Sequence, residues 1–271
     1  MPASRRRRPP VLAGVNQKGG VGKTTTVINV GAAIADLDHH VVIVDLDPQA
    51  NATSGIGVDP ARERNGVYEV LFGEATLADV LLDSSNPGLR IAPSRRGLAG
   101  AEIELATETG REARLRDALA HLPDDVDLVL LDCPPSLGLL TLNALTAADQ
   151  MLVPLQAEYF ALEGLSHLVE TQQLVRTHLN PQLTIGGILL TQFDTRTTLA
   201  WEVLQEVRRA YQDRVLRTLI PRNVRLSEAP SHGLPVTRYD ASCRGAVAYR
   251  ELAQELLARL QLAAPIKESM S

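Results

Sequence analysis

The chain has 271 residues, and the 45 % that are apolar can supply the core of one large α/β domain or two small ones. Only 3 % are aromatic, and a core of Leu, Val, Ala and Ile is typical of parallel strands covered by helices. The net charge of -5 argues against nucleic acid if it is evenly spread. No apolar run reaches the roughly 20 residues of a membrane helix or forms a signal peptide, and Cys133 and Cys243 make no disulfide framework, so we expect a cytosolic protein.

In chain order, the pattern begins with a basic arm and continues as alternating strands and helices. Residues 1–10, MPASRRRRPP, predict a flexible arm because four adjacent like charges repel one another and prolines block a helix. The expected strands are VLAGV (11–15), HVVIVDL (40–46), VDLVLLD (126–132), MLVPLQ (151–156), TIGGILLT (184–191) and VLRTLIP (215–221). Helical spacing links Val27, Val30, Ile34 and Leu37, then Leu115, Leu119 and Leu122, then Leu162, Leu165, Leu168 or Val169, and Val175.

This alternation predicts repeated βα units, which imply right-handed crossovers, a parallel sheet, and ligands at the carboxyl ends of its strands. Residues 54–112, with clusters of Gly, Pro and Ser, interrupt the pattern as an insertion. We expect a single domain over 11–262, followed by a flexible tail over 263–271.

The loop NQKGGVGKTTT, residues 16–26, follows the first expected strand and opens a helix, which is the setting of a phosphate-binding loop. Its glycines let the backbone wrap round phosphate oxygens, and the amides at the helix N-terminus face the anion. Lys23 is expected to reach the β and γ phosphates of ATP, and the Thr24 hydroxyl to bind Mg²⁺. The residues expected to bind nucleotide in this loop are Lys18, Gly19, Gly20, Val21, Gly22, Lys23, Thr24 and Thr25.

Carboxylates follow two later strands. VDLDPQ (44–49) places Asp45 and Asp47 at the carboxyl end of a strand, near the phosphate loop, where they could hold water or magnesium. LVLLDCPPS (128–136) looks like a Walker B segment whose Asp132 holds a magnesium-bound water. Cys133, with no paired thiol beside it, is interpreted as a buried small residue.

One position of the loop departs from the usual pattern and indicates a family. The usual loop has a glycine five residues before the glycine of GKT. In this chain that position is Gln17, and Lys18 follows it. This is the deviant Walker A pattern, KGGxGK[ST], and the chain resembles the ParA/MinD group of P-loop ATPases. The resemblance implies an α/β P-loop fold, with a mostly parallel twisted sheet of about seven or eight strands and helices on both faces.

The resemblance also implies catalytic roles. Lys18 would cross a dimer interface to the phosphates of the partner's nucleotide, neutralising charge that develops during phosphoryl transfer as an arginine finger does. Asp47 matches the family aspartate that orients the attacking water, and like Asp132 it could contact magnesium through a water. Asp45 is expected to support the loop or the water shell of the metal.

Longer stretches resemble one branch of that group, the chromosomal ParA, or Soj, partition ATPases. They are DPQANATSGIG (47–57), PLQAEYFALEGL (154–165) and IPRNVRLSEAPSHGLPV (220–236), and the resemblance covers about 11–262. In that branch Pro221 and Asn223 lie beside the adenine, as a proline wall and an amide that can read base edges.

Charge is unevenly distributed, because residues 196–250 hold ten Arg and no Lys against five Asp and Glu, a balance of +5 that leaves -10 elsewhere. This predicts a basic face on an acidic body, or else scattered surface arginines. The family binds double-stranded DNA without sequence preference, and Arg196 and Arg225 match positions that contact it, with Arg222 a further candidate. Such phosphate contacts make affinity fall with salt.

The resemblance implies a cycle as well. ATP would join two protomers into a homodimer on nucleoid DNA, and hydrolysis stimulated by a ParB/Spo0J-type centromere-binding protein would separate them. The arginines at 5–8 could contact DNA or that partner, or form a solvated tail.

Three other classes fit less well. A MinD-like membrane-associated cell-division ATPase would end in a basic amphipathic helix, whereas Leu252, Leu256 and Leu260 predict a helix packed on the core, so no membrane contact is expected. Neither cysteine, Cys133 or Cys243, has the context of an iron-sulfur reductase of the nitrogenase type. A small-molecule enzyme such as dethiobiotin synthetase is disfavoured by the paired lysines and the long SEAPSHG region.

Overall fold

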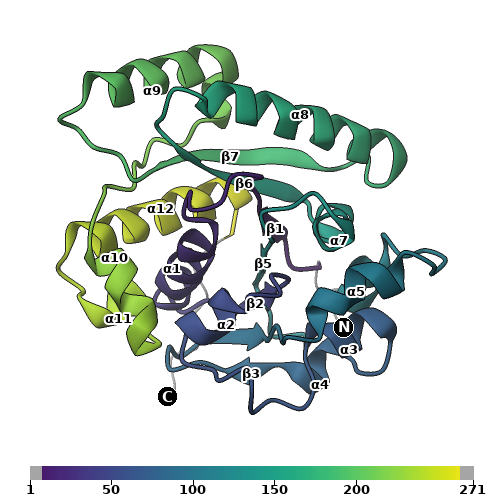
Figure 1. Cartoon of the computed structure of the whole chain (residues 1–271). Coiled ribbons are helices and arrows are strands. Elements are labelled where there is room, and N and C mark those ends of the chain that lie inside the picture. Colours follow the sequence, from purple (N-terminus) through teal and green to yellow (C-terminus); the bar gives the residue numbers. More distant parts are fainter. Residues whose placement is uncertain (1–7, 263–271) are drawn as a thin grey trace, which may run out of the picture.

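The computed structural model describes residues 8–262, and its centre is one seven-stranded sheet of order β3-β4-β2-β5-β1-β6-β7 (Figure 1). Neighbouring strands are parallel except for the antiparallel pair β3 and β4, so the expected mostly parallel sheet is confirmed. The strands are β1 (Val11–Gly14), β2 (Val41–Asp45), β3 (Leu82–Asp83), β4 (Leu89–Ala92), β5 (Leu128–Asp132), β6 (Gln150–Gln156) and β7 (Thr184–Thr191).

Helices cover both faces of the sheet. One face carries α1 (Lys23–Ala35), α2 (Asn51–Gly55), α11 (Val236–Tyr239) and α12 (Arg244–Leu260). The other carries α3 (Val67–Phe72), α4 (Leu77–Val80), α5 (Leu98–Leu105), α6 (Arg114–Leu119), α7 (Leu139–Ala147), α8 (Ala161–His178) and α9 (Thr198–Tyr211). The short helix α10 (Arg225–Glu228) and the 3₁₀ turns η1 (Gln212–Arg214) and η2 (Ala229–His232) complete the described elements.

Each central strand is buried on both sides. In β1, Val11 and Ala13 join one core while Leu12 joins the other. This two-sided burial explains why the strands have nearly continuous rather than alternating hydrophobicity. It also fixes the sheet rigidly, so that the loops at its carboxyl edge have a firm support.

The expected strand at 215–221 is wrong in part. The segment runs beside β7 but makes only isolated bridges, one at each end. Between these bridges, the backbone amides of Arg217 and Thr218 donate to the carboxylate of Glu255 on α12, at 2.8 and 3.0 Å. Because a side chain satisfies these amides, the ladder to β7 is interrupted, and apolar composition alone could not show this.

The region 54–112 contributes to the sheet instead of lying outside it. It holds β3 and β4, and β4 pairs in parallel with β2 from Leu89 to Ala92. The strand has only four residues, too few for the pattern to stand out. Two helical patterns also ran too far, since Leu37 and Leu122 lie beyond the ends of α1 and α6.

The ends of the chain were expected to be flexible, and residues 1–7 and 263–271 lie outside the described part. Arg8 lies inside it, where it donates to the Ala147 carbonyl at 2.7 Å and pairs with Asp149 at 3.5 Å. At the other end Leu252 and Leu256 are buried, so α12 packs on the core as expected. None of the described helices has the length and apolar character required to cross a membrane.

Candidate nucleotide-binding site

A cavity of about 810 Å³ opens at the carboxyl edge of the sheet, where the loops after β1, β2, β5 and β7 meet the segment 220–234. Parallel strands bring these loops together because all their carboxyl ends lie at one edge. Nine residues expected to act on the nucleotide or its magnesium line this cavity, namely Gly19, Gly20, Gly22, Lys23, Thr24, Thr25, Asp47, Pro221 and Asn223. The structure therefore gathers in one place most of the residues expected to bind nucleotide.

The phosphate loop is shaped by left-handed glycines and tied to the neighbouring strands. Gly20 and Gly22 have φ of 76° and 84°, and Gly22 caps α1 without any side-chain hydrogen bond, so the first amides of the helix remain available to an anion. The Thr191 hydroxyl donates to the Val21 carbonyl at 2.8 Å, and Gln192 Nε2 to the Gly20 carbonyl at 2.6 Å. Val21 itself is buried outside the cavity lining, so only its backbone can serve the nucleotide.

The two lysines of this loop have opposite environments. Lys23 is 7 % exposed, and its Nζ donates to the Lys18 carbonyl at 3.1 Å within the cavity wall. Burial lowers the pKa of Lys23, although the charge of Asp132 opposes this. Lys18 does not line the cavity; its side chain is 55 % exposed and forms an ion pair with Glu158, just after β6.

Two buried carboxylates stand side by side at the ends of β2 and β5, where Asp45 and Asp132 are register partners. Asp45 accepts hydrogen bonds from the Thr53 amide (2.9 Å) and hydroxyl (2.6 Å), and from the Asp47 amide (3.1 Å). Asp45 thus supports the loop after β2, and its burial raises the pKa of this carboxyl to about 6.

Asp132 differs from Asp45 in having no such support. It is fully buried, and neither carboxylate oxygen accepts a hydrogen bond of normal geometry. Burial, followed by the charge of Asp45, raises the pKa of Asp132 well above its ordinary value, while the nearby Thr24 hydroxyl lowers it only partly. A buried carboxylate without partners is costly unless a cation or its water shell completes it.

These residues fit a magnesium ion bound together with a nucleotide. Mg²⁺ keeps several waters and commonly takes one or two carboxylates plus substrate phosphates. Asp132 supplies unpaired oxygens behind the cavity, and Thr24 and Asp47 line it. Among the residues that the structure describes, no group of three or more His, Cys, Asp or Glu could hold a metal alone. The site thus suits an ion that arrives with phosphates.

Cys133 and Cys243 contribute to the packing of the fold and to a helix cap. Cys133 is fully buried, as expected, and burial raises the pKa of its thiol well above the ordinary value. Cys243 caps the start of α12, where its sulfur accepts from the Ala246 amide at 3.4 Å.

Two glycines bring the loop after β2 against the far wall of the cavity. Gly57, with φ of 89°, follows α2, and Gly233, with φ of 65°, follows η2. A Cβ built on Gly233 would lie 2.7 Å from the Cα of Gly57. The two segments therefore touch backbone to backbone.

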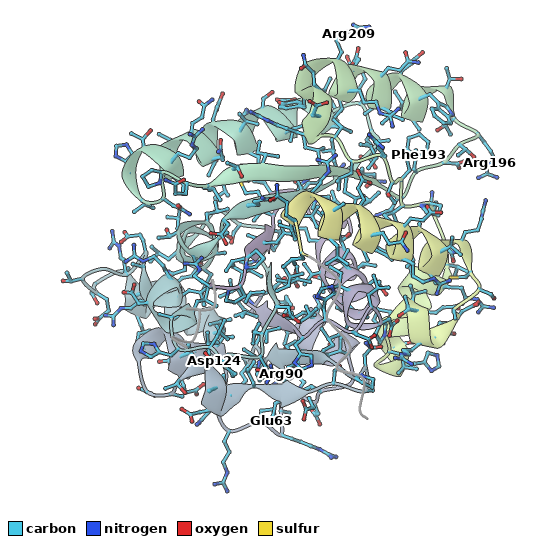
Figure 2. All side chains as sticks on the ribbon, turned by 180° about the vertical axis from the view of Figure 1, so that it is seen from behind. Glu63, Arg90, Asp124, Phe193, Arg196 and Arg209 are labelled. Atoms are coloured by element: carbon cyan, nitrogen blue, oxygen red, sulfur yellow. The ribbon has the colours of Figure 1, made fainter. Side chains whose placement is uncertain are left out.

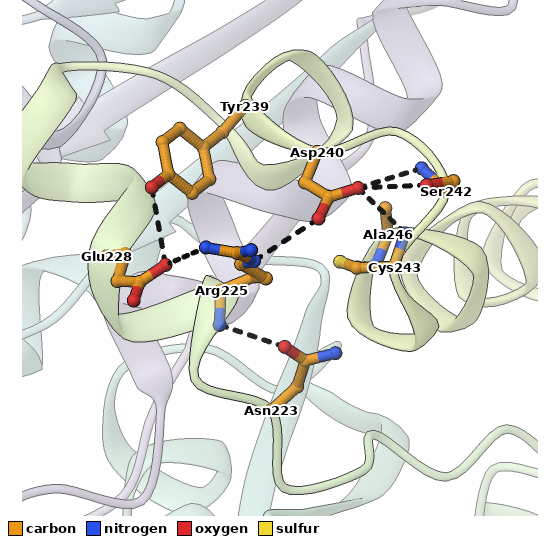
Figure 3. Close-up of polar contacts among 8 residues, drawn as sticks. All are labelled: Asn223, Arg225, Glu228, Tyr239, Asp240, Ser242, Cys243 and Ala246. Carbon is orange, nitrogen blue, oxygen red and sulfur yellow. Dashed lines mark hydrogen bonds and ion pairs between the residues drawn. The ribbon is translucent and has the colours of Figure 1, made fainter.

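The arginines expected to bind DNA lie outside the phosphate loop. Arg196 is in the β7–α9 loop and is 85 % exposed, with its guanidinium paired to Asp194. Arg225 begins α10 and pairs with Glu228 and Asp240 (Figure 3). Arg222 lines the rim of the nucleotide cavity. Both the β7–α9 loop and α10 lie on the left of the molecule in Figure 1.

Several residues of the site were missed by sequence reasoning. Gln49, Asn51 and Ser54 line the cavity, and all three lie within DPQANATSGIG, whose resemblance to the family could have indicated them. Glu158, the partner of Lys18, lies in PLQAEYFALEGL, but no spacing rule connects it with a loop 140 residues earlier.

Known proteins resemble this chain over nearly its whole length. A sequence model described as an AAA domain matches residues 10–185. The chain is 50 % identical over 248 residues to the sporulation initiation inhibitor protein Soj of Bacillus subtilis, covering 92 % of this chain and 98 % of that protein. It is 51 % identical over 248 residues to the chromosome-partitioning ATPase Soj of Treponema pallidum, covering 92 % and 97 %.

Solved structures agree with this fold. A Mycobacterium smegmatis protein described as cobyrinic acid a,c-diamide synthase, with bound ADP and magnesium, has a TM-score of 0.82 and 41 % identity, covering 94 % of this chain and 96 % of that one. MinD from Pyrococcus horikoshii, complexed with Mg-ADP, has a TM-score of 0.73 at 23 % identity and shares the fold. From its phosphate loop, its sheet and its relatives, the chain belongs to the ParA/Soj family of chromosome-partitioning P-loop ATPases.

Proposed function

We propose that the chain is a DNA-partition ATPase that works as an ATP-dependent homodimer. The observation that carries this proposal is that the two lysines of one loop lie in different places. Lys23 lies inside the nucleotide cavity and Lys18 lies outside it. A lysine that turns away from its own cavity is suited to the nucleotide of a second protomer. The names of the relatives at about 50 % identity support a partition role.

Nucleotide binding follows from the loop and its neighbours. The amides at the start of α1 and the Lys23 ammonium face the phosphates, while Pro221 and Asn223 form the wall proposed for the adenine. When bound, Mg²⁺ neutralises phosphate charge, with Thr24 as a direct ligand and Asp132 and Asp47 holding its waters. ATP and magnesium fit this cavity, and the M. smegmatis relative was solved with magnesium and either ADP or an ATP analogue.

Hydrolysis needs a positioned water. Asp47 lines the cavity, and the Gln49 amide donates to its Oδ1 at 3.0 Å, which fixes the orientation of the carboxylate. We assign Asp47 to orienting the attacking water, and Lys18 of the partner to neutralising charge that develops on the phosphates. The assignment of Lys18 requires the dimer, because Lys18 cannot serve its own cavity while it pairs with Glu158.

DNA binding is assigned to the arginines of the β7–α9 loop and α10. Arg196 and Arg225 are exposed to 85 % and 47 %, and neither lines the nucleotide cavity. Arginines on an open surface suit phosphate contacts without base readout. A ParB-type partner that stimulates hydrolysis would release the DNA, and nucleoid association follows from the same binding.

A MinD-like role is less well supported. It would require an amphipathic helix free to enter lipid, whereas the last described helix, α12, packs on α1 with Leu252 and Leu256 buried.

The deciding experiment is to measure the ATPase rate of the full chain alone, with nonspecific duplex DNA, with the host's ParB-type protein, and with both. We expect DNA and the partner together to stimulate more than the sum of each alone. Anionic lipid vesicles form a parallel arm. Stimulation by vesicles in place of DNA would contradict the partition role, and so would a rate that none of these additions changes.

A further inference from the structure

The exposed arginine of the β7–α9 loop already holds a carboxylate in the way that it would hold a phosphate. Arg196 Nε donates to Asp194 Oδ1 at 2.9 Å, and Nη2 donates to Oδ2 at 2.7 Å. This two-bond arrangement uses the edge of the guanidinium that recognises phosphate. The Arg196 side chain is 85 % exposed and that of Asp194 is 25 % exposed, so an incoming polyanion can reach the guanidinium from solvent.

The loop itself builds this pair. Asp194 Oδ1 also accepts the Arg196 amide at 3.1 Å, and the Asp194 carbonyl accepts the Thr197 hydroxyl at 3.0 Å. Trp201 Nε1 donates to the Thr195 carbonyl at 3.0 Å. The turn therefore places acid and base together before any ligand arrives, and the labelled Arg196 lies at the edge of the molecule in Figure 2.

The charge of the acid is firmly retained. The Arg196 guanidinium holds the pKa of the Asp194 carboxyl far below its ordinary value. Asp194 is therefore ionised at any pH at which the protein works, and it would lie among phosphates once DNA took its arginine. It repels them by like charge.

The second arginine shows the same arrangement with more carboxylates. Arg225 Nη1 bonds Glu228 at 2.7 Å, and its Nε lies 3.3 Å from Asp240 (Figure 3). The Tyr239 hydroxyl donates to Glu228 at 3.3 Å. Arg225 thus faces two anions, so neither Arg196 nor Arg225 is a free cation in the unbound protomer.

We call the exposed surface that holds Arg196 and Arg225 the arginine face. We propose that Asp194 is an intrachain competitor of DNA, which sets the affinity of this face by exchanging Arg196 with backbone phosphates. This inference rests on the DNA-binding role proposed above. An exposed ion pair is weak, so the dense charge of a duplex can displace the carboxylate. The freed carboxylate then opposes tight binding, which keeps the complex readily reversible.

The test removes the charge and keeps the turn. Asp194→Asn retains Oδ1 as the acceptor for the Arg196 amide but makes the side chain neutral. With a nonhydrolysable ATP analogue, we expect the dissociation constant for nonspecific duplex DNA to fall about threefold per protomer, and about tenfold for a dimer that presents two loops. Because the effect is electrostatic, the gain should shrink as salt rises, whereas a purely structural change would not show this dependence.

A matched control separates this local effect from net charge. Glu63→Gln also changes the net charge from -5 to -4, but Glu63 lies far from Arg196 in Figure 2. We expect it to change DNA affinity by less than roughly 1.5-fold. If Asp194→Asn binds no better than Glu63→Gln, the competitor role is wrong.

Two further measurements keep the result unambiguous. Trp201 is the only tryptophan of the chain, so its emission without DNA reports whether the loop of Asp194→Asn is intact. If the emission differs from wild type, Asp194→Ser, whose hydroxyl can also cap the turn, must give the same gain in affinity, and failure to do so overturns the proposal.

The double variant Arg196→Ala with Arg225→Ala tests the underlying function separately. If it loses DNA while Asp194→Asn equals wild type, only the competitor role fails. If it binds DNA normally, the arginine face itself is wrongly assigned, and the competitor role falls with it.

Discussion

The nucleotide cavity and the arginine face place their charges in opposite ways. Behind the cavity, Asp132 is completely buried and neither of its oxygens accepts a hydrogen bond of normal geometry. On the face, Arg196 is 85 % exposed and has its partner at 2.7 Å. Burial without a partner is expensive, so such a carboxylate implies a ligand that completes it. Exposure with a partner is cheap, so such an arginine can exchange its partner easily.

This difference suggests two kinds of binding in one protein. The cavity gains much from its ligand, because nucleotide and magnesium relieve a cost that the empty protein bears. In the proposed complex with DNA, Arg196 and Arg225 would gain little from each contact, because each phosphate would replace a carboxylate of the chain. Strong binding at the cavity and weak, salt-sensitive binding at the face are the expected result.

The largest effect should come from the lysine inside the cavity. Lys23→Ala removes a cation at the phosphates, so we expect ATP affinity to fall about 100-fold or more. Lys18→Ala is the matched control, because it removes the same charge from the same loop but outside the cavity; its affinity should stay within about threefold of wild type. Titration with a fluorescent ATP analogue measures both.

The same pair tests the dimer. Lys18→Ala should lose the ATP-dependent dimer in light scattering while it retains nucleotide. Dimers that persist in this variant, or an equal loss of nucleotide affinity in both variants, would contradict the different roles assigned to Lys23 and Lys18.

A smaller effect is expected from the unpaired carboxylate. Asp132→Asn replaces a buried ionisable carboxyl that has no hydrogen-bond partner of normal geometry, so the free energy of unfolding of the nucleotide-free protein should rise by about 1–3 kcal/mol at neutral pH. The variant should also gain less stability from magnesium and ATP than wild type gains. Urea denaturation measures both, and Asp83→Asn, at an exposed position, should change the free energy by less than about 0.5 kcal/mol.

The free energy of unfolding of Asp132→Asn should also depend less on pH than that of wild type. The folded state raises the pKa of Asp132 above its ordinary value of 3.8, and that of Asp45 to about 6. Each group therefore contributes to the free energy of unfolding below pH 3.8. This contribution is lost as pH rises through the pKa that the group has in the folded state. In Asp132→Asn this decline should be smaller than in wild type. An equal decline would mean that Asp132 has a partner in solution.

The smallest effect is expected on the face. Arg196→Gln removes an exposed guanidinium, so the melting temperature should change by less than about 2 °C. DNA binding, not stability, should report its loss. A larger change in melting temperature, measured by calorimetry, would show that the pair with Asp194 holds the fold together and is not free to exchange.

Much of the cavity could be predicted from the sequence because its signals are local. The glycines and lysines of the phosphate loop all fall within residues 18–23, and Asp45 and Asp132 each end a run of apolar residues that a buried parallel strand requires. A phosphate loop after a strand also fixes where the other strands must end. Local sequence patterns are therefore enough to predict most residues of the cavity.

The remaining features depend on contacts between distant segments. The Glu255 carboxylate interrupts the expected strand at 215–221 from a helix about 40 residues later, and β4 is recognisable only once β2 lies beside it. Lys18 and Glu158 are 140 residues apart. Asp194 and Arg196 are two residues apart, but Asp194 lies just outside the basic region 196–250, so the charge pattern does not indicate that they pair.

The contact between Gly57 and Gly233 has a consequence for how the sequence can vary. Both residues have positive φ, and the Cβ of any other residue at 233 would meet the Cα of Gly57 at 2.7 Å. Gly73 also has positive φ, but nothing lies within 4 Å of its Cβ position. Saturation mutagenesis should therefore find two isolated positions that accept glycine only, outside every nucleotide motif, where the wall of the cavity leaves room for a backbone and nothing more.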